Sequence, residues 1–480
     1  MSKWDSEPPR RWLLFWLVIA VTVVTRYLRL AEWDMWTDEA QTLLTAQSAE
    51  FGFGPMYITA PINFILTRFA VAVFGPNELG LRLVPFLAGV LAVALVYHVV
   101  RIWLGTRPAL LAALVVAVSM WHVRWSQTGR HFSLQALLIL LAVHWYLIYD
   151  RRDRMIALAG ASFAFLLALF VHSSSGLYIV ALLVFVGGKW LHQRLVVGAA
   201  PGELRKRAVA AAWLLLPLLI YLPIYVVVGK YLLANRTAWN PPWNILASFT
   251  FFTPPYLSFM ALAGGLFLIR EHNDLGLLLL SVWLFPTALL TAASSVTIAS
   301  AAYCLASVMP VAALAGTACD RLLILGRRTK QLIPAAAVVA GLFVGQLYDL
   351  AHYYTVYNGF KGRWREATVM VGERREPGSL FVAAEGDVAQ YYLGNGAAEW
   401  FDAYEQKIGS PGFPPEGVTG VWYVLYWNES PILRMDERVA RYIKDNASLV
   451  GLYPVQYGGK DKTLAVFHQR VSSGQQVDSQ

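Results

Sequence analysis

The sequence carries too little charge for a soluble protein of its length. Only 14% of its 480 residues are Asp, Glu, Lys or Arg, whereas 57% are hydrophobic. With a mean hydropathy of +0.49, this composition excludes an ordinary soluble domain and indicates a polytopic membrane protein.

Residues typical of metal and nucleotide sites are also scarce. The two cysteines, Cys304 and Cys319, fall in or at the end of one apolar segment, which argues against a disulfide and against metal ligation. The sequence contains no Gly-rich phosphate loop, no Cys/His cluster with metal-ligand spacing and no recognisable internal repeat. No cofactor and no bound metal are therefore expected.

The hydrophobic residues are grouped into segments long enough to cross a bilayer. A hydrocarbon core of about 30 Å needs about 20 apolar residues per helix, and about eleven segments qualify. The first, from Trp12 to Leu30, is too long for a cleaved signal peptide. The others lie near 82–104, 108–122, 131–149, 155–171, 176–188, 209–228, 254–269, 275–293, 300–318 and 331–350. Residues 155–188 can alternatively be read as one bent helix.

The net charge of +9 is explained by the loops in which Lys and Arg lie. If the N-terminus is inside, alternate loops carry basic clusters such as Arg151, Arg152 and Arg154, and the opposite loops carry scattered cations. The positive-inside rule thus accounts for most of the charge without a nucleic-acid partner. It predicts that the loop 31–81 and the C-terminal region lie on the outer face of the cytoplasmic membrane.

The long loop 31–81 begins with an acidic segment, WDMWTDEAQT at residues 33–42. Asp34, Asp38 and Glu39 lie there among tryptophans, either as solvated residues or as part of a site. Further along, residues 61–75 are apolar around Arg68 and too short to span comfortably, so we expect them to lie along the interface.

From His352 the composition changes to a soluble pattern. SLFVAAE, VWYVLYW and TLAVFHQ are predicted strands, and DVAQYYLG and residues 431–446 are predicted helices, which indicates a small α/β domain with a partly parallel sheet. The predicted domains are a transmembrane domain at 1–351, a soluble outer domain at 352–470 and a disordered tail at 471–480.

Ionisable residues at the outer ends of spans are further candidates, because burying them is costly unless they are paired or hydrated. They are Arg82, Arg130, His131, His172, Lys230 and Arg236. The alternatives are snorkelling to headgroups for Arg82, a hydrated helix cap for His172, and plain solvation for Lys230 and Arg236.

Together these groups fit a lipid-linked phosphate sugar. Arginine suits a phosphate because its planar guanidinium group donates bidentate hydrogen bonds. A carboxylate can take the proton of an acceptor hydroxyl during attack on the anomeric carbon. The phosphate leaves as an anion, so this chemistry does not require a separate general acid.

Several motifs resemble the membrane glycosyltransferases of the GT-C fold, specifically the group related to protein O-mannosyltransferases and lipid A aminoarabinose transferases. The motifs are the acidic pair at 38–39, APINFILTRF followed by FGPNELGLRLVPFLAG, SQTGRHFSLQALL, and KGRWREAT at the junction to the outer domain. The resemblance implies that Asp38 is the catalytic base and Glu39 a supporting or substrate-orienting group. It also implies donor phosphate or sugar binding by Arg82, Arg130 and His172, and Asp34 is interpreted as a solvated loop residue.

Two departures from the family pattern concern the donor. Relatives often carry two prolines where this chain has Ala60 and Pro61, and an arginine before a late helix where this chain has Ala302. Phosphate binding must therefore rely on other cations, or the donor differs.

The sequence thus predicts a GT-C membrane protein with about eleven transmembrane helices and a small outer α/β domain. The predicted activity is inverting, metal-independent transfer of one sugar from a polyprenyl phosphate to a hydroxyl of a glycan, lipid or protein. Alternatives are transfer of an oligosaccharide or phospho-headgroup, use of a divalent ion held by Asp34, Asp38 or Glu39, and a lipid-linked sugar transporter or flippase. The absence of repeat symmetry counts against the last.

Overall fold

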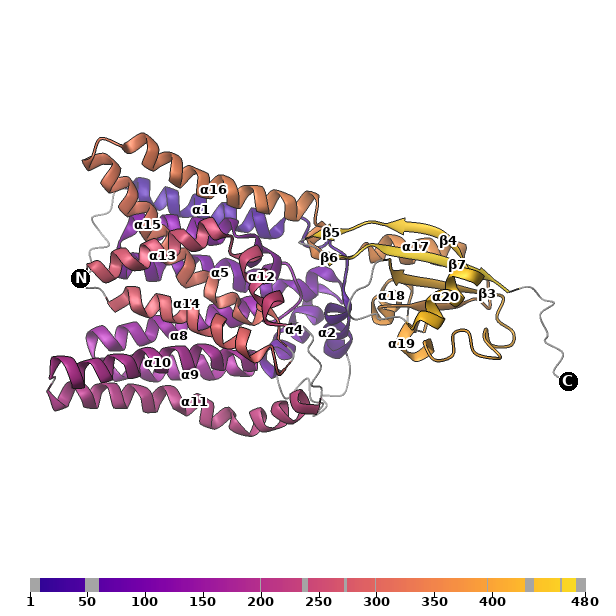
Figure 1. Ribbon diagram of the computed structural model, residues 1–480, viewed down its shortest axis with the longest axis horizontal. Coiled ribbons are helices and arrows are strands. Elements are labelled where there is room, and N and C mark those ends of the chain that lie inside the picture. Colours follow the sequence, from indigo (N-terminus) through magenta and orange to yellow (C-terminus); the bar gives the residue numbers. More distant parts are fainter. Residues whose placement is uncertain are drawn as a thin grey trace. The chain divides into compact units, whose positions relative to one another are not determined.

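The computed structural model describes residues 9–47, 60–198, 200–234, 241–271, 274–297, 299–394, 396–427, 436–457 and 460–471. The chain divides into two compact units, which we call the helical unit (residues 1–30 and 48–350) and the C-terminal unit (residues 31–47 and 351–480) (Figure 1). The acidic segment therefore groups with the C-terminal unit, which the sequence did not indicate. Beyond Val471, the predicted disordered tail lies outside the described residues.

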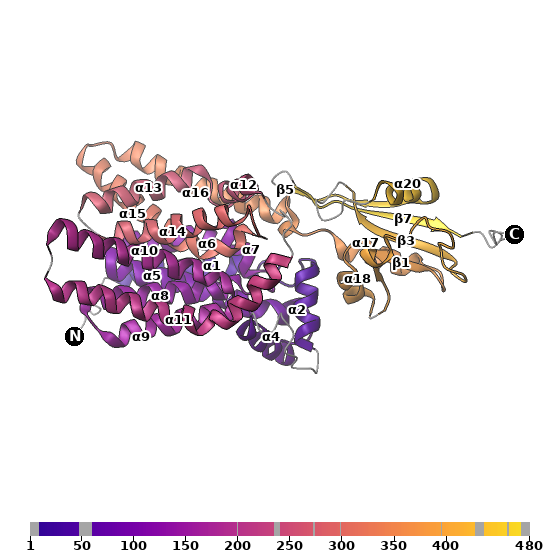
Figure 2. The same cartoon turned by 60° about the horizontal axis from the view of Figure 1, so that its bottom comes forward.

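The helical unit consists of helices, of which the longest run roughly side by side in both views (Figures 1 and 2). They are α1 (Pro9–Tyr27), α4 (Pro61–Phe74), α5 (Glu78–Leu104), α6 (Thr106–Val118), α7 (Met120–Ser126), α8 (Phe132–Arg152), α9 (Met155–Val171), α10 (Gly176–His192), α11 (Pro201–Ala234), α12 (Pro242–Phe252), α13 (Pro255–Arg270), α14 (Asp274–Ala293), α15 (Val308–Arg328) and α16 (Leu332–Thr355). Short helical turns occur at η1 (Ser173–Ser175), η2 (Gln193–Val197) and η3 (Ala301–Ser307).

Within the described residues, seven helices are long and apolar enough to cross a membrane, or nine if each of two bent pairs is one span. The chain is thus an integral membrane protein. The segments predicted at 12–30 and 155–171 form shorter apolar helices, as does Pro61–Phe74. The count of about eleven spans remains a prediction.

One predicted span, 108–122, is broken in the structure. Helices α6 and α7 meet at an angle of 61° beside Ser119, whose N–H donates to the Val116 carbonyl at 3.3 Å. The fully buried Arg26 of α1 donates to the carbonyl oxygens of Val116 and Ala117, both at 2.9 Å. A guanidinium group buried among helices thus stabilises the break.

The chain also breaks at His172, whose backbone is extended between α9 and η1. Helix α11 packs against both α9 and α10. The alternative of one bent helix over 155–188 is therefore wrong, and the two predicted segments are separate helices.

Charged residues from several predicted inner loops meet at one end of the helical unit. Lys189 of α10 lies 3.5 Å from Asp150 of α8 and 2.6 Å from Asp274 of α14. Arg207 of α11 also pairs with Asp150, which is buried. These loops thus share one end of the unit, and the side of the membrane that this end faces remains a prediction.

The C-terminal unit is built around a five-stranded sheet with strand order β2-β1-β3-β7-β4. Strand β1 pairs in parallel with β2 and β3, whereas β7 is antiparallel to β3 and β4. The elements are α2 (Thr37–Gln47), η4 (Asn358–Phe360), α17 (Trp364–Arg374), β1 (Leu380–Ala383), α18 (Gly386–Leu393), β2 (Glu399–Trp400), α19 (Phe401–Tyr404), β3 (Gly420–Tyr426), α20 (Glu437–Asn446), β4 (Ser448–Tyr453), β5 (Gln456–Tyr457), β6 (Lys460–Asp461) and β7 (Leu464–Arg470). The predicted α/β domain with a partly parallel sheet is confirmed.

Helices cover both faces of this sheet because strand β3 is apolar on both sides. Val421, Tyr423 and Leu425 point to one face and pack with Val439 and Ile443 of α20. Helix α17 contacts β3, β4 and β7. A strand buried on both faces explains why VWYVLYW reads as a continuous apolar run.

Candidate functional site

The acidic pair lies in the first turn of helix α2, where the sequence indicated a loop. The N–H groups of Glu39 and Ala40 donate to the carbonyl oxygen of Trp36 at 2.9 and 3.0 Å, so Trp36 is the N-cap residue. Asp38 is half-buried, and its carbonyl oxygen accepts from the Thr42 hydroxyl at 2.6 Å. Carboxylates in a first helical turn are stabilised by the positive end of the helix dipole.

Glu39 is held by a lysine that follows the last predicted span. Its side chain is fully buried, and Oε2 lies 2.5 Å from Nζ of Lys361, which is 5% exposed. A buried carboxylate needs such a partner because removing it from water is costly. The pairing suits the supporting role predicted for Glu39, which remains a prediction.

The interpretation of Asp34 as a solvated residue is wrong. Asp34 is buried, and its Oδ1 lies 3.9 Å from Nε of Arg365. Next to it, the Trp33 ring stacks on Tyr354 at a centroid distance of 6.0 Å. A Cβ on Gly359 would lie 2.8 Å from the Trp33 ring, so this position has to be glycine. The start of the acidic segment is thus packed inside the C-terminal unit.

The two buried carboxylates of the acidic segment have different basic partners. Glu39 pairs with Lys361 and Asp34 lies beside Arg365. In the described part of the chain, no group of three or more His, Cys, Asp and Glu side chains is arranged to hold a metal ion.

A second polar cluster forms in the helical unit from helix ends that are distant in sequence. The ring of His131, before α8, stacks on the ring of His172, after α9, at 4.2 Å and 12°. The Tyr303 ring of η3 lies 4.9 Å from His172. We call these residues, with Arg130, the histidine cluster. It joins two motifs that the resemblance had singled out separately.

Hydroxyl and amide groups fix the His172 side of this cluster. The Ser174 hydroxyl lies 2.7 Å from Nδ1 of His172. Nε2 of Gln135 donates to the Ser174 hydroxyl at 2.8 Å and to the Ser175 hydroxyl at 3.0 Å. Helix α8 is thus tied to η1, and the imidazole is oriented by its own neighbours.

The charge of the histidine cluster comes from Arg130. Burial, and then the Arg130 guanidinium, lower the pKa of His172 to about 3. The imidazole of His172 is therefore neutral around pH 7 and can donate or accept a hydrogen bond without adding positive charge.

The other predicted donor ligands are placed differently. Arg82 is fully buried at the start of α5 and donates through Nη1 to the Leu30 carbonyl at 2.8 Å, so the snorkelling alternative is wrong. Lys230 is exposed on α11. Arg236 lies outside the described residues. Donor binding by these three residues stays a prediction.

Several residues that contact the acidic segment or the histidine cluster had no predicted role. Lys361 and Arg365 belong to KGRWREAT, which was noted only as a junction motif. Tyr303 follows Ala302, the position at which relatives often carry an arginine. The alanine at position 302, where relatives often carry an arginine, could have drawn attention to Tyr303.

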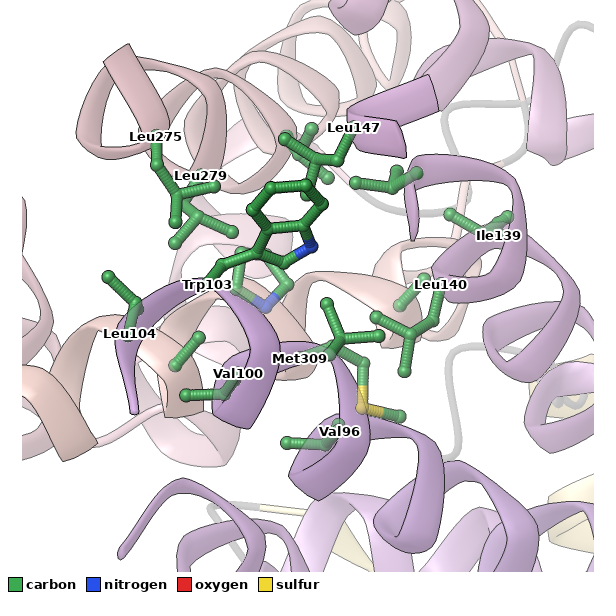
Figure 3. Close-up of a pocket in the computed structure, with 16 residues that line it drawn as sticks. Val96, Val100, Trp103, Leu104, Ile139, Leu140, Leu147, Leu275, Leu279 and Met309 are labelled. Carbon is green, nitrogen blue, oxygen red and sulfur yellow. The ribbon is translucent and has the colours of Figure 1, made fainter. Parts of the chain in front are cut away.

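An apolar cavity lies within the helical unit (Figure 3). It has a volume of about 550 Å³, counting the part open to the surroundings, and lies between α5, α8, α14 and α15. Trp103, Leu147 and Leu275 line it near the end that carries the charge cluster of Asp150. The cavity suits hydrocarbon, and its lining reaches Ala306 of η3, the turn that also carries Tyr303.

The chain has the GT-C fold, since it is similar over most of its length to solved enzymes of that fold. ArnT from Cupriavidus metallidurans in the apo state gives a TM-score of 0.55 at 14% identity, covering 94% of this chain and 97% of that chain. The same protein bound to undecaprenyl phosphate gives 0.55 at 14% identity, covering 95% and 98%. The oligosaccharyltransferase of Archaeoglobus fulgidus in the apo form gives 0.57 at 13% identity, covering 88% and 70%.

Residues 59–200 match the family model described as dolichyl-phosphate-mannose-protein mannosyltransferase. This range includes four of the predicted donor ligands: Arg82, Arg130, His131 and His172. No curated protein matches the chain in sequence. The predicted resemblance to the group around the protein O-mannosyltransferases is confirmed.

Proposed function

We propose that the protein is an inverting glycosyltransferase that moves one monosaccharide from a polyprenyl phosphate to an acceptor hydroxyl on the outer face of the cytoplasmic membrane. The observation that carries the proposal is the acidic pair in the first turn of α2, with Glu39 fixed by Lys361, in a chain of the GT-C fold. Two solved relatives support the donor class, because one binds undecaprenyl phosphate and the other dolichol phosphate.

In the proposed reaction the Asp38 carboxylate takes the proton of the acceptor hydroxyl. The acceptor oxygen forms a bond to the anomeric carbon as the bond from that carbon to the phosphate oxygen breaks, which inverts the configuration. The polyprenyl phosphate leaves with the electron pair as an anion and needs no general acid. Glu39, held by Lys361, orients the substrate or supports the base.

The proposal assigns donor binding to the predicted cations and histidines. Arg130 binds the phosphate through charge-assisted hydrogen bonds, and the histidine rings and Tyr303 supply flat surfaces and hydrogen-bonding groups for the sugar. Arg82, Lys230 and Arg236 are retained as further phosphate ligands. The glycan, lipid or protein acceptor is not specified by these contacts.

The test is sugar transfer by purified Asp38→Asn protein. The substrate pair is first found by mass spectrometry of lipid, glycan and protein fractions from a deletion strain, in which the product is missing. Loss of the base should lower kcat by about 10²- to 10⁴-fold. Asp402→Asn removes an exposed carboxylate of α19 and should keep full activity. Full activity of Asp38→Asn would rule out the proposed mechanism.

The likeness to an oligosaccharyltransferase favours one second candidate, transfer of a whole oligosaccharide. The mass added to the acceptor separates the two, because a single sugar and an oligosaccharide differ by several sugar units. A transferred phosphate would likewise identify a phospho-headgroup transferase. Loss of activity on chelation would indicate a divalent ion, and flux in proteoliposomes without covalent transfer would indicate a flippase.

A further inference from the structure

The acidic segment docks at the edge of the C-terminal sheet where the parallel strands end. Glu385 follows strand β1, Tyr426 is the last residue of β3, and Tyr392 lies on α18, the helix that follows β1. Helix α18 packs against α2. The carboxyl edge of parallel strands is where open α/β sheets bind their ligands. Here that edge holds a segment of the same chain.

Two of the contacts at this edge are made to the backbone of the acidic segment. The N–H of Thr37 donates to Oε2 of Glu385 at 2.9 Å, and the N–H of Met35 donates to the Tyr392 hydroxyl at 2.9 Å. Thr37 is the first residue of α2, and a helix cannot pair its own first N–H groups. Glu385 therefore completes the start of the helix that carries Asp38.

The Glu385 carboxylate is itself held in place. Glu385 is buried, and its Oε1 accepts a hydrogen bond from the Tyr426 hydroxyl. Nζ of Lys462 lies 3.5 Å from that hydroxyl oxygen and 4.5 Å from the centre of the Tyr426 ring. An acceptor whose other oxygen is held by Tyr426 defines the position of the Thr37 N–H more sharply than a mobile side chain would.

A third anchor acts on the side chain next to Asp38. Lys361 pairs with Glu39 and follows directly after η4, where its carbonyl oxygen accepts from Nδ2 of Asn358 at 3.0 Å. The residues on both sides of Asp38 are thus bound to the later part of the same unit, Thr37 to Glu385 and Glu39 to Lys361.

We infer that residues 351–480 of the C-terminal unit position the acidic pair, with Glu385, Tyr392 and Lys361 as positioning residues. The inference rests on the proposed function, in which Asp38 is the base. Catalysis requires the base to lie within hydrogen-bonding reach of the acceptor hydroxyl, and a displacement of about 1 Å can lower the rate about 100-fold. Loosening the first turn of α2 therefore lowers kcat without removing any group that binds the donor.

The docking is tested first without substrate, by amide hydrogen exchange of the full-length protein in nanodiscs. In Glu385→Ala and Tyr392→Phe, exchange in a peptide covering residues 35–39 should be at least about tenfold faster than in the wild type. Glu373→Ala and Tyr453→Phe change the same residue types elsewhere in the unit and should leave this peptide unchanged. Unchanged exchange in both docking variants would overturn the inference. Tyr392→Phe removes only one hydroxyl, so it keeps the test valid if Glu385→Ala fails to fold.

Kinetics then separate positioning from a purely structural role. We expect Glu385→Ala and Lys361→Met to lower kcat about 10- to 100-fold while KM for the lipid-linked donor stays the same. Glu385→Gln keeps the size and one accepting oxygen, so it should restore most of kcat. Lys444→Met, an exposed lysine of α20, is the control for Lys361.

Failure of the positioning role and failure of the proposed function would give different results. Faster exchange of residues 35–39 with unchanged kcat would overturn the positioning role and leave the proposed function intact. Full activity of Asp38→Asn would overturn the proposed function, whereas the exchange result needs no substrate and would still report the docking.

Discussion

At the scale of single residues, buried charges in this protein are held by protein groups. The Glu39 carboxylate pairs with Lys361, and Arg82 donates to the Leu30 carbonyl. Arg26 donates to two carbonyl oxygens beside the break between α6 and α7. Because each unpaired buried charge would cost several kcal/mol, burial by itself does not mark a ligand-binding residue here. The role of each buried charged residue is therefore inferred from the group with which it pairs.

The environment of the histidine cluster gives a prediction for His172 and Arg130. The pKa of His172 is lowered to about 3, so its imidazole is neutral over the pH range of about 5.5 to 8. We expect His172→Gln to leave the pH dependence of the donor KM unchanged over this range. Arg130→Gln should raise the donor KM about 10- to 100-fold at every pH, because it removes charge-assisted hydrogen bonds to the phosphate.

The measurement is KM for the lipid-linked donor in each variant at several pH values. Arg154→Gln, an exposed arginine before α9, is the control for Arg130. If the wild type showed a transition near pH 6.5 that disappeared in His172→Gln, the histidine would be titrating and its neutral state would be disproved.

At the scale of elements, the sequence predicted those whose pattern is long or strongly apolar. Strands β1, β3 and β7 and helix α18 occur where their apolar runs predicted them. Helix α2 was missed. It has 11 residues, and an isolated helix of that length is marginal in water. Its first N–H binds Glu385, 348 residues away, so no local pattern could have indicated it.

The two broken spans also show that the sequence predicts a feature only where the signal for it is local. The break between α12 and α13, at 83°, has a local signal in Pro254 and Pro255, and the predicted span accordingly began there. The break between α6 and α7 has no proline at Ser119 and depends on Arg26 of another helix. The sequence therefore indicated an unbroken span at 108–122.

Helix α4 presents an apolar stripe, which gives a prediction about the membrane. Asn63, Phe64 and Thr67 are buried, whereas Phe69 and Val73, four residues apart, are 69% and 58% exposed. An apolar stripe of this kind on a short helix fits the predicted position along the interface, with Phe69 in the lipid.

A spin label at Phe69→Cys tests this position. In nanodiscs we expect the label to be accessible to oxygen and protected from a water-soluble nickel complex, because oxygen concentrates in hydrocarbon. Glu373→Cys, on the exposed side of α17, should show the opposite preference. The native Cys304 and Cys319 are buried and should not react with the label. Equal nickel accessibility at the two sites would contradict the membrane placement of α4.

At the scale of the whole molecule, the sequence indicated the class of the protein better than its site. The GT-C fold and the acidic pair could be recognised because both depend on patterns within short stretches of chain. The environment of the pair could not, because Lys361 and Glu385 are more than 300 residues away from it. The histidine cluster likewise depends on how α8, α9 and η3 pack together.

The proposed reaction on the outer face predicts the orientation of the chain in the membrane. Basic residues of the predicted inner loops gather at one end of the helical unit. The positive-inside rule predicts that this end faces the cytoplasm and that Asp38 lies on the outer side. In intact cells, a membrane-impermeant maleimide should therefore label Glu373→Cys, whereas Thr329→Cys, between α15 and α16, should react only after permeabilisation.

Both positions are exposed in the structure, so a difference in labelling reports the side of the membrane and not burial. The buried native cysteines keep the background low. Labelling of Thr329→Cys alone in intact cells would invert the topology and place the acidic pair in the cytoplasm. The donor would then have to be used on the inner face, and the proposed reaction on the outer face would be wrong even if Asp38 proved essential.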